Sequence, residues 1–466
     1  MTFNTDTYDK LVEDLFDRHP SVQREGFSAG AYKPGLAGME SFDASLGHPW
    51  QRFRTIHVAG TNGKGSVSSM LAAALAASGL RVGLYTSPHL VDFRERIKII
   101  RMEESLSLET VPTLGHVRGR GPLDTSSPRG RCRQWEGWSE AEVSGERLSS
   151  SGPEMISKED VFKFLTENKL EGLSFFEITT GMAFWWFAKQ EVDVAVIEVG
   201  LGGRLDSTNI ITPELSVVTS IGLDHCAMLG DTRAQIAAEK AGIFKPGVPA
   251  LVWGWDNETG PVFEARAADT PCPLFFADGF ESEDIELDLT GPCQPVNLRT
   301  VTAALELLGV EADREALAHT AAVTGFHGRW ERLQDNPDVI CDIGHNPAAL
   351  KINFERLEAL GRPLFIVYGV MADKDLDGIA PLMPAVAEYF LAAPATSRAL
   401  PVTALQERLA TLRPDLHTTA APSVAAAVRM ALEKASEVPG SLVYIGGSTF
   451  VVSQTLKNNI TYNIKN

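Results

Sequence analysis

Cysteine is scarce in this sequence, with five among 466 residues, and no two cysteines form a C-x-x-C pair. They stand far apart, at Cys132, Cys226, Cys272, Cys293 and Cys341. This spacing argues against a zinc ribbon and against a disulfide framework, because both depend on cysteines set at short or recurring intervals. We therefore expect free thiols.

Long hydrophobic runs are also absent, and none reaches the roughly 18 residues that a membrane-spanning helix needs. The first six residues, Met-Thr-Phe-Asn-Thr-Asp, have neither the basic nor the apolar region of a signal peptide. Both absences predict a cytoplasmic protein with no membrane partner.

Positive charge is in deficit, because 42 lysines and arginines face 60 aspartates and glutamates, for a formal net charge of -18. Such a balance disfavours nonspecific nucleic-acid binding, so we expect no nucleic-acid partner. An anionic substrate would have to be attracted locally, against the overall field. The basic residues that stand inside motifs are therefore informative.

What the sequence does contain is an ordinary globular composition, 44% hydrophobic and 22% charged, in a chain too long for a single core. Through the first half, short runs rich in β-branched residues alternate with helical patterns. Strands are predicted at 55–59, 81–85, 192–199 and 215–221, with a helix at 66–78. This alternation predicts an α/β fold built on a parallel sheet.

The alternation resumes in the last third of the chain, which predicts a second, smaller α/β domain. A helix is predicted at 297–308 and strands at 339–342, 363–368, 388–391 and 441–445. Glycine and proline interrupt the pattern at 289–294, where we place the join. The predicted domains are thus 1–294 and 295–466, with a cleft between them.

Residues from about 101 to 153 interrupt the α/β pattern, and we interpret them as an insertion. The segment is rich in Arg, Gly, Ser and Pro and has little apolar periodicity. Long segments of this kind are either functional lids or surface excursions. Arginine clusters at 118–121 and 129–133 are suited to contact an anion, but a mobile surface excursion is the favoured interpretation. An error in the gene model is a further alternative.

The strongest local motif is a glycine-rich loop between a predicted strand and a predicted helix. In that position backbone N–H groups and the helix dipole converge on a phosphate. The glycines let the backbone approach closely, and the lysine adds a charge suited to β- and γ-phosphates. A glycine-rich turn without function is the alternative. The loop consists of Gly60, Thr61, Asn62, Gly63, Lys64, Gly65 and Ser66.

The loop departs from the pattern G-x-x-x-x-G-K-[ST] because Gly65 stands where a magnesium-binding hydroxyl should follow the lysine. The hydroxyl must come from elsewhere, and Ser66 and Ser87 are the candidates, the latter at the end of the next predicted strand. Glu198 ends the long apolar strand, where its carboxylate is suited to bind a hard cation such as magnesium. An incidental carboxylate at a strand end is the structural alternative.

Other polar residues each have two interpretations. His225 follows a predicted strand and is either a metal ligand or a satisfied core histidine. Lys240 lies in a predicted helix, where most lysines face solvent. In the second half, Arg329 is suited to neutralise a transferred phosphate and Asp342 to bind ribose hydroxyls. A surface arginine and a helix-capping aspartate are the alternatives.

Taken together, these segments closely resemble the folylpolyglutamate synthase and dihydrofolate synthase family, which belongs with the Mur ligases. The resemblance covers nearly the whole chain apart from 101–153. It implies the Mur ligase architecture, in which a P-loop NTPase-like ATP-binding domain precedes a smaller Rossmann-like domain. The motifs are GTNGKGS at 60–66, TSPHL at 86–90, FRERI at 93–97, EVGLGGRLDSTN at 198–209, LDH at 223–225, EKAGI at 239–243, GRWE at 328–331 and DIGHNP at 342–347.

The resemblance also implies roles for individual residues. ATP is bound by the loop at 60–66 and, from the second domain, by Asn297, Arg329, Asp342 and His345. Magnesium, with two ions expected, is held by Ser87, Glu198 and His225, and a carbamylated Lys240 helps to hold the second ion. Asp206 lies near the pterin substrate, Ser448 lies near the incoming glutamate, and His345 is also expected to bind substrate. The residues expected to act in catalysis are Lys64, Lys240, Arg329 and His345.

Two segments depart from the family pattern. The adenine-side motif, which often begins His-Gln, reads Cys293-Gln294 here. The insertion directly follows the FRERI segment, near a loop that the family uses around its substrate. Family members are commonly monomeric, so we expect a monomer.

The implied reaction joins glutamate to a folate-type carboxylic acid. The carboxylate attacks the γ-phosphate of ATP, giving an acyl phosphate and ADP, and the glutamate amine then displaces phosphate. The acceptor stays open: dihydropteroate (dihydrofolate synthase activity), a reduced folate (tetrahydrofolate synthase activity, extending a polyglutamate tail), or both.

Two alternatives remain. The first is a Mur-type ligase acting on a UDP-sugar peptide, which is disfavoured because only 56 residues precede His57, too few for the UDP-binding domain of those enzymes. The second is a non-catalytic nucleotide-binding regulator. It is disfavoured because such a module has no physical need for the whole set of motif residues.

Overall fold

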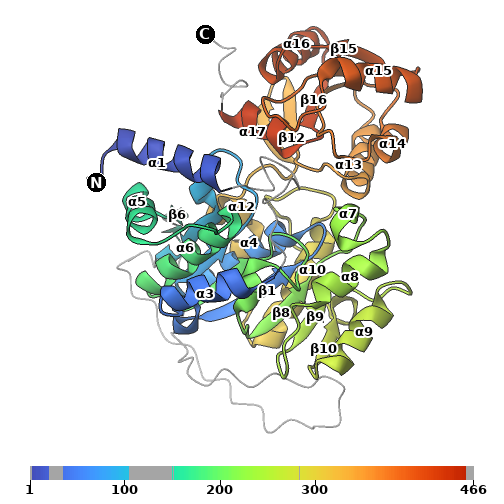
Figure 1. Ribbon diagram of the computed structural model, residues 1–466. Helices are drawn as coiled ribbons and strands as arrows, with labels where there is room; N and C mark the ends of the chain where they lie inside the picture. The colour runs from blue at the N-terminus through green and yellow to red at the C-terminus, as the bar shows by residue number, and fades with distance from the viewer. Residues whose placement is uncertain (1–2, 20–34, 104–148, 151, 283, 458–466) are drawn as a thin grey trace, which may run out of the picture.

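The computed structural model describes residues 3–19, 35–103, 149–150, 152–282 and 284–457. Its strands form two large sheets that follow one another along the chain, one within residues 54–276 and the other within residues 331–446. The second sheet and its helices, coloured orange to red, sit on one side of the larger first part (Figure 1). The predicted two-domain α/β fold is therefore confirmed.

The first sheet has eight strands in the order β10-β9-β8-β1-β7-β2-β3-β6. Neighbours from β10 to β2 are parallel, as predicted, whereas β3 runs antiparallel to β2 and to β6. Residues 86–96, which contain one turn of 3-10 helix at Phe93–Arg96 but no crossover α-helix, connect β2 to β3, and such a connection lets the strand direction reverse. The strands are β1 (Arg54–Ala59), β2 (Val82–Tyr85), β3 (Ile97–Ile100), β6 (Glu154–Met155), β7 (Val194–Glu198), β8 (Leu215–Val218), β9 (Ala250–Val252) and β10 (Leu274–Phe276).

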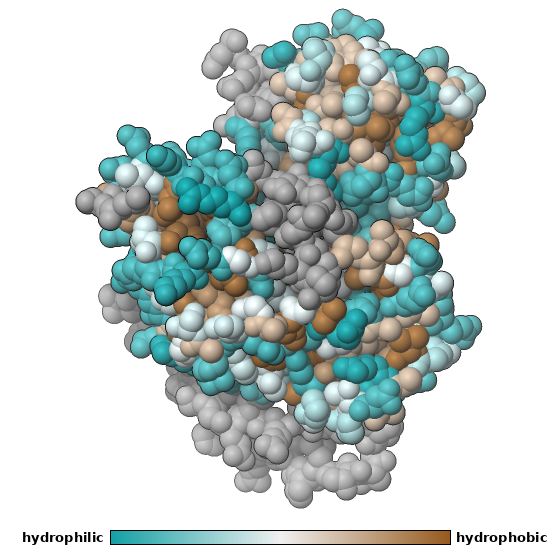
Figure 2. Space-filling view, viewed as in Figure 1, coloured by the Kyte–Doolittle hydropathy of each residue, from teal (hydrophilic) through white to brown (hydrophobic). Residues whose placement is uncertain are grey.

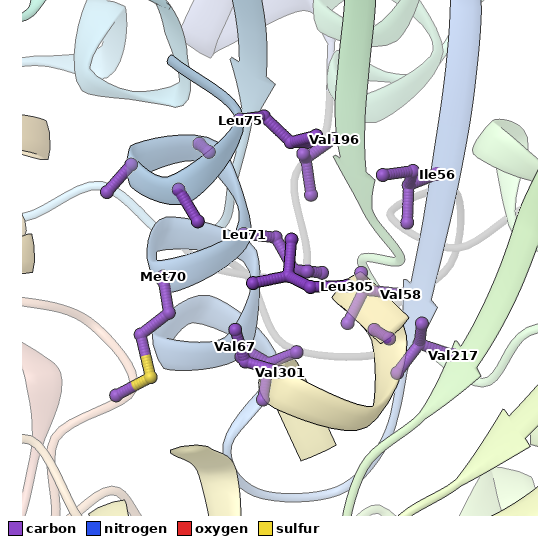
Figure 3. Close-up of a cluster of buried hydrophobic side chains, with 14 of the residues drawn as sticks. Ile56, Val58, Val67, Met70, Leu71, Leu75, Val196, Val217, Val301 and Leu305 are labelled. Atoms are coloured by element: carbon purple, nitrogen blue, oxygen red, sulfur yellow. The ribbon is translucent and has the colours of Figure 1, made fainter. Parts of the chain in front are cut away.

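Helices cover both faces of this sheet because successive side chains along a strand point to opposite faces. Along β7, Val194 and Val196 join the core beneath α4 and α10, whereas Ala195 and Ile197 join the core beneath α6. Figure 3 shows the first of these cores, where side chains of α4 and α10 meet those of β1 and β7. The helices are α1 (Thr5–Arg18), α3 (Ala37–Ser45), α4 (Lys64–Ala77), α5 (Lys158–Glu167), α6 (Phe175–Lys189), α7 (Cys226–Leu229), α8 (Arg233–Ala241), α9 (Gly260–Asp269), α10 (Gln294–Leu308), α11 (Arg314–Ala318) and α12 (Thr320–Thr324).

The second sheet has six strands in the order β11-β12-β16-β13-β14-β15, and only β11 is antiparallel to its neighbour. The four predicted strands of this half match β12, β13, β14 and β16 to within one residue at each end. The strands are β11 (Glu331–Asp335), β12 (Asp338–Cys341), β13 (Leu364–Tyr368), β14 (Glu388–Leu391), β15 (His417–Ala420) and β16 (Leu442–Gly446). The helices are α13 (Pro347–Ala359), α14 (Leu376–Ile379), α15 (Val402–Leu412), α16 (Val424–Glu437) and α17 (Thr449–Lys457).

The packing of α10, α11 and α12 differs from what a join at 294 and 295 implies. Leu298, Val301, Leu317 and Val323 from these helices belong to the same hydrophobic core as α4. The second sheet begins only at β11. Helix α10 reads as the start of a new α/β pattern in the sequence, but its apolar face is buried against the first domain.

The insertion lies almost entirely outside the described residues, including both arginine clusters and Cys132. Within the described residues its ends form the two-stranded pair β4 (Met102–Glu103) and β5 (Ser149–Ser150). The other four cysteines are free, as predicted. Among the described helices, none is long and apolar enough to cross a membrane. On the face seen in Figure 2, hydrophilic residues surround small scattered groups of hydrophobic ones.

The glycine loop after β7 packs against the end of α8. A Cβ at Gly203 would lie 2.7 Å from the carbonyl oxygen of Glu239 and 2.9 Å from that of Lys240. A Cβ at Gly242 would meet the backbone of Arg204 at 2.5 Å. Two glycines thus bring this loop and the helix that carries Lys240 into backbone contact.

We expect Gly203→Ala to destabilise the protein, because its methyl group meets backbone atoms that cannot rotate away. Overpacking of this kind costs about 1–3 kcal/mol in the free energy of unfolding, which urea denaturation measures. Gly279→Ala is the matched control, since nothing lies within 4 Å of its Cβ position. Equal stability of both variants would contradict the close packing.

Candidate active site

The phosphate loop at 60–66 joins β1 to α4 at the carboxyl end of the parallel strands. Gly63 caps α4 with a φ of 89°, and a Cβ there would lie 2.4 Å from Asn297 Oδ1. The Lys64 ammonium donates a hydrogen bond to the carbonyl oxygen of Gly60 at 3.1 Å. The loop therefore has the glycine-dependent, strand-to-helix geometry that its motif predicts.

One cleft between the two domains collects nearly all the residues that the sequence singled out. Both sheets direct the carboxyl ends of parallel strands toward it, which is where open α/β sheets bind ligands. The predicted site residues that line it are Gly60, Thr61, Asn62, Gly63, Lys64, Gly65, Ser66, Ser87, Glu198, His225, Lys240, Asn297, Arg329, Asp342 and His345.

Asp206 and Ser448 do not line this cleft. Asp206 is buried, and its carboxylate accepts hydrogen bonds from the backbone N–H groups of Leu201 and Thr208 at 2.8 and 3.0 Å. It therefore holds the glycine loop after β7 in place. Ser448 is also buried, and its hydroxyl accepts from the N–H of Phe450, whereas its neighbour Thr449 lines the cleft.

Glu198 and Ser87 lie side by side where β7 and β2 end. The N–H of Ser87 donates to Glu198 Oε2 at 2.9 Å, and the carboxylate is buried. Burial raises the pKa of Glu198, and the positive charge of Lys64 opposes this shift. Of the two serine candidates, Ser66 has its hydroxyl bonded by Gln294 Nε2 at 3.3 Å.

His225 and Lys240 complete the first-domain side of the cleft. His225 has a φ of 54°, a left-handed conformation that is uncommon outside glycine and often marks a functional position. Burial lowers the pKa of His225 to about 4, so the imidazole is neutral, as a metal ligand must be. Burial, together with the charge of Lys64, lowers the pKa of Lys240 to about 7.

These residues fit a magnesium ion. Glu198 provides a buried carboxylate whose Oε2 is bonded by the Ser87 N–H, and Ser87 and His225, whose imidazole is neutral, line the same cleft. Hard oxygen donors of this kind suit magnesium, which keeps several of its waters and shares phosphate oxygens. In the described part of the chain, no group of three His, Cys, Asp or Glu residues is placed to hold a metal by itself.

Arg329 enters the cleft from the linker before β11. Its guanidinium carbon lies 5.8 Å from the centre of the Phe326 ring, over the face. A Cβ at Gly65 would lie 2.9 Å from the same ring. Phe326 therefore packs between Arg329 and the first turn of α4, and a side chain at position 65 would require the Phe326 ring to move. Phe326 was not selected by the sequence analysis.

Asp342 ends β12 and is held by three donors. Its Oδ1 accepts from the Gly344 N–H and from Asn353 Nδ2, both at 2.7 Å, and its Oδ2 accepts from the Trp330 N–H at 3.0 Å. The carboxylate is buried but still lines the cleft. Nearby, His345 Nδ1 lies 3.0 Å from the carbonyl oxygen of Ile343.

Asp224 is a site residue that the sequence analysis did not select. Its Oδ1 accepts from Lys374 Nζ at 3.0 Å, and its Oδ2 accepts from Asn346 Nδ2 at 3.2 Å and lies 3.6 Å from His345 Nε2. Burial alone would raise the pKa of Asp224, but its contacts with His345, His225 and Lys374 hold it well below its ordinary value. Three residues of the second domain thus converge on one carboxylate of the first.

Asn346 also reaches the phosphate loop, where its Nδ2 donates to Asn62 Oδ1 at 3.1 Å. The position of Asp224 beside His225 in the LDH motif was the one available signal for this cluster. Lys374 had none, because it comes from a loop of the second domain far away in the sequence.

The fold and this cleft define a two-domain nucleotide-dependent ligase of the Mur type. Residues 328–449 match the model of the Mur ligase glutamate ligase domain. The folylpolyglutamate synthase of Lacticaseibacillus casei is 31% identical over 386 residues, covering 77% of this chain and 81% of the relative. The chain belongs to the folylpolyglutamate synthase and dihydrofolate synthase family.

Solved structures of this family share the whole fold. E. coli FolC in complex with DHPP and ADP has a TM-score of 0.74 and 26% identity, covering 98% of both chains. A bifunctional folylpolyglutamate synthase/dihydrofolate synthase with Mn, AMPPNP and L-glutamate bound has a TM-score of 0.70 and 25% identity, covering 92% of this chain and 95% of that one. The similarity to both spans the two domains.

The lowered pKa of Lys240 predicts that the free energy of unfolding depends on pH. Its pKa is about 7 in the folded protein against an ordinary value of 10.5, so the unfolded chain binds more protons between these pH values. Stability therefore rises with pH across this window. Between pH 7 and pH 10.5, the free energy of unfolding of the wild type should rise on the order of a few kcal/mol relative to that of Lys240→Met. Urea unfolding in CO₂-free buffer measures this gain, and a pH-independent difference would contradict it.

Proposed function

We propose that this protein is an ATP-dependent ligase that joins glutamate to a folate-type carboxylic acid through an acyl phosphate. The observation that carries the proposal is the convergence of the loop at 60–66 and Glu198 from the first domain with Arg329 from the second. The ligands named for the two solved relatives, nucleotides, DHPP and L-glutamate, support it. A folate-type acceptor is thereby favoured over a UDP-sugar peptide.

The proposed chemistry begins with attack of the acceptor carboxylate on the γ-phosphate of ATP. Lys64 and Arg329, from opposite sides of the cleft, stabilise the negative charge of the transferring phosphoryl group. Phosphate then serves as the leaving group when the glutamate amine attacks the acyl carbon. His345, with Thr449 and the adjoining Ser448, is proposed to orient glutamate.

Magnesium, when bound, would neutralise phosphate charge and align the reacting oxygens. Ser87, Glu198 and His225 would hold the first ion and Lys240, as a carbamate, the second. Asn297 and Asp342 are proposed to contact the nucleoside. Asp206 is proposed to act indirectly near the pterin substrate, because it holds the glycine loop after β7 in place through that loop's N–H groups.

The limit between the two domains is proposed to lie near Gly325 rather than at 294. The packing of α10 to α12 with α4 supports this limit, as does the family match that starts at residue 328. Because one chain supplies both sides of the cleft, the active form is proposed to be a monomer.

Lys64→Ala should abolish glutamate-dependent ADP formation, because it removes the positive charge that the loop presents to the γ-phosphate. Purified protein is incubated with ATP, magnesium, glutamate and either dihydropteroate or a reduced folate. Coupled ADP release gives the rate, and mass spectrometry of the product shows which acceptor is extended and by how many glutamates. Lys163→Ala, at an exposed position of α5, is the control. Turnover that is independent of glutamate and of both acceptors would overturn the proposed function.

Carbamylation of Lys240 should add the mass of one CO₂ to the native protein. Reaction with CO₂ requires a neutral amine, and the pKa of about 7 makes one available near neutral pH. Native mass spectrometry in bicarbonate buffer detects the adduct, and Lys240→Arg should lack it. A bare amine in fully active wild-type enzyme rejects the carbamate.

A further inference from the structure

The backbone around Arg329 is strained and fixed on both sides. Trp330 has a φ of 52°, a left-handed conformation that is an outlier for a bulky aromatic residue. Its N–H donates to Asp342 Oδ2 at 3.0 Å, and its carbonyl oxygen accepts from Thr290 Oγ1 at 3.2 Å. Such strain persists only where the surroundings over-determine the conformation, and it concentrates at functional sites.

The Trp330 side chain is held as firmly as its backbone. The indole is buried, and the guanidinium carbon of Arg356 lies 4.5 Å from the ring centre. Arg356 Nη1 also donates to the carbonyl oxygen of Thr290. Arg356 thus contacts both Trp330 and Thr290, and it does so from outside the cleft.

On the other side of Arg329, Gly328 is anchored in the same way. Its N–H donates to Glu331 Oε2 at 2.7 Å, and its carbonyl oxygen accepts from the Ile343 N–H at 3.0 Å. A Cβ at Gly328 would lie 2.9 Å from Ile343 and 3.1 Å from Leu90. Both peptide neighbours of Arg329 are therefore fully bonded, and the guanidinium is directed over Phe326 beside the phosphate loop.

We propose that Asp342, Thr290 and the left-handed Trp330 form a rigid mount that fixes Arg329 toward the phosphate loop. Asp342 and Thr290 are then positioning residues for the phosphoryl-transfer step and act through Arg329. This proposal rests on the proposed function for its kinetic test. It differs from a ribose contact by Asp342, which would act on nucleotide binding instead.

Thr290→Val should lower kcat and leave the KM for ATP nearly unchanged, and Asp342→Asn should lower kcat in addition to any rise in the KM for ATP from its proposed nucleoside contact. Loss of one hydrogen bond that orients Arg329 corresponds to about a fivefold fall in kcat for Thr290→Val. In an Arg329→Ala background the same substitution should change kcat by less than about 1.5-fold, because residues that act through one group are not additive. Thr411→Val is the matched control, since its hydroxyl also donates to a backbone carbonyl on an exposed helix.

Two kinetic outcomes would overturn the mount. A fall in kcat of equal size in the wild-type and Arg329→Ala backgrounds would mean that Thr290 acts only on general stability. A raised KM for ATP at unchanged kcat in Asp342→Asn would assign Asp342 to nucleotide binding alone.

Hydrogen exchange tests the mount separately from catalysis. The Trp330 amide should exchange slowly in the wild type and at least about tenfold faster in Asp342→Asn, because its acceptor is Asp342. Mass spectrometry with fragmentation across residues 326–332 resolves this amide. If the wild type lacks ligase activity but protects the amide, the proposed function fails and the mount stands. Rapid exchange in an active wild type rejects the mount alone.

Discussion

The contact of Asp224 with Lys374, Asn346 and His345 sets how the two domains face each other. An ion pair whose partners are both largely shielded from water strongly resists loss of either partner, because the remaining charge would be buried alone. Asn346 extends the same contact to Asn62 in the phosphate loop. The Asp224 carboxylate therefore constrains the distance between the two sides of the cleft, together with the contacts that Thr290 and Leu90 make with the second domain.

Close packing of Phe326 occurs at the position where the phosphate loop departs from the common motif. At Gly65 a side chain would collide with Phe326, the residue on which Arg329 rests. The loop lacks a hydroxyl after the lysine, and at that position it contacts Phe326, which lies beneath the Arg329 guanidinium. Ser87, whose N–H donates to Glu198, is the proposed source of a hydroxyl for the metal.

Local patterns predicted four strands of each sheet, helices α4 and α10 and the glycine loop, because β-branched runs, apolar periodicity and a strand-to-helix glycine loop are properties of short segments. The packing of α10 on α4 and the Asp224–Lys374 pair depend on residues far apart in the sequence. No periodicity reports such pairings. Asp206 shows the same limit, because the sequence does not report that its two oxygens hold the backbone N–H groups of Leu201 and Thr208.

The bonding of the carboxylates decides the charge that the cleft presents. Asp224 is paired with Lys374, Asp342 accepts from three donors, and Glu198 accepts from Ser87. Lys64 and Arg329 are cations of the cleft lining for which the described carboxylates provide no ion pair. A protein with a net charge of -18 can thus attract a polyphosphate at this one place. Lys64 and Arg329 come from different domains. A polyphosphate bound to both would therefore favour the same relative position of the two domains as the Asp224–Lys374 ion pair does.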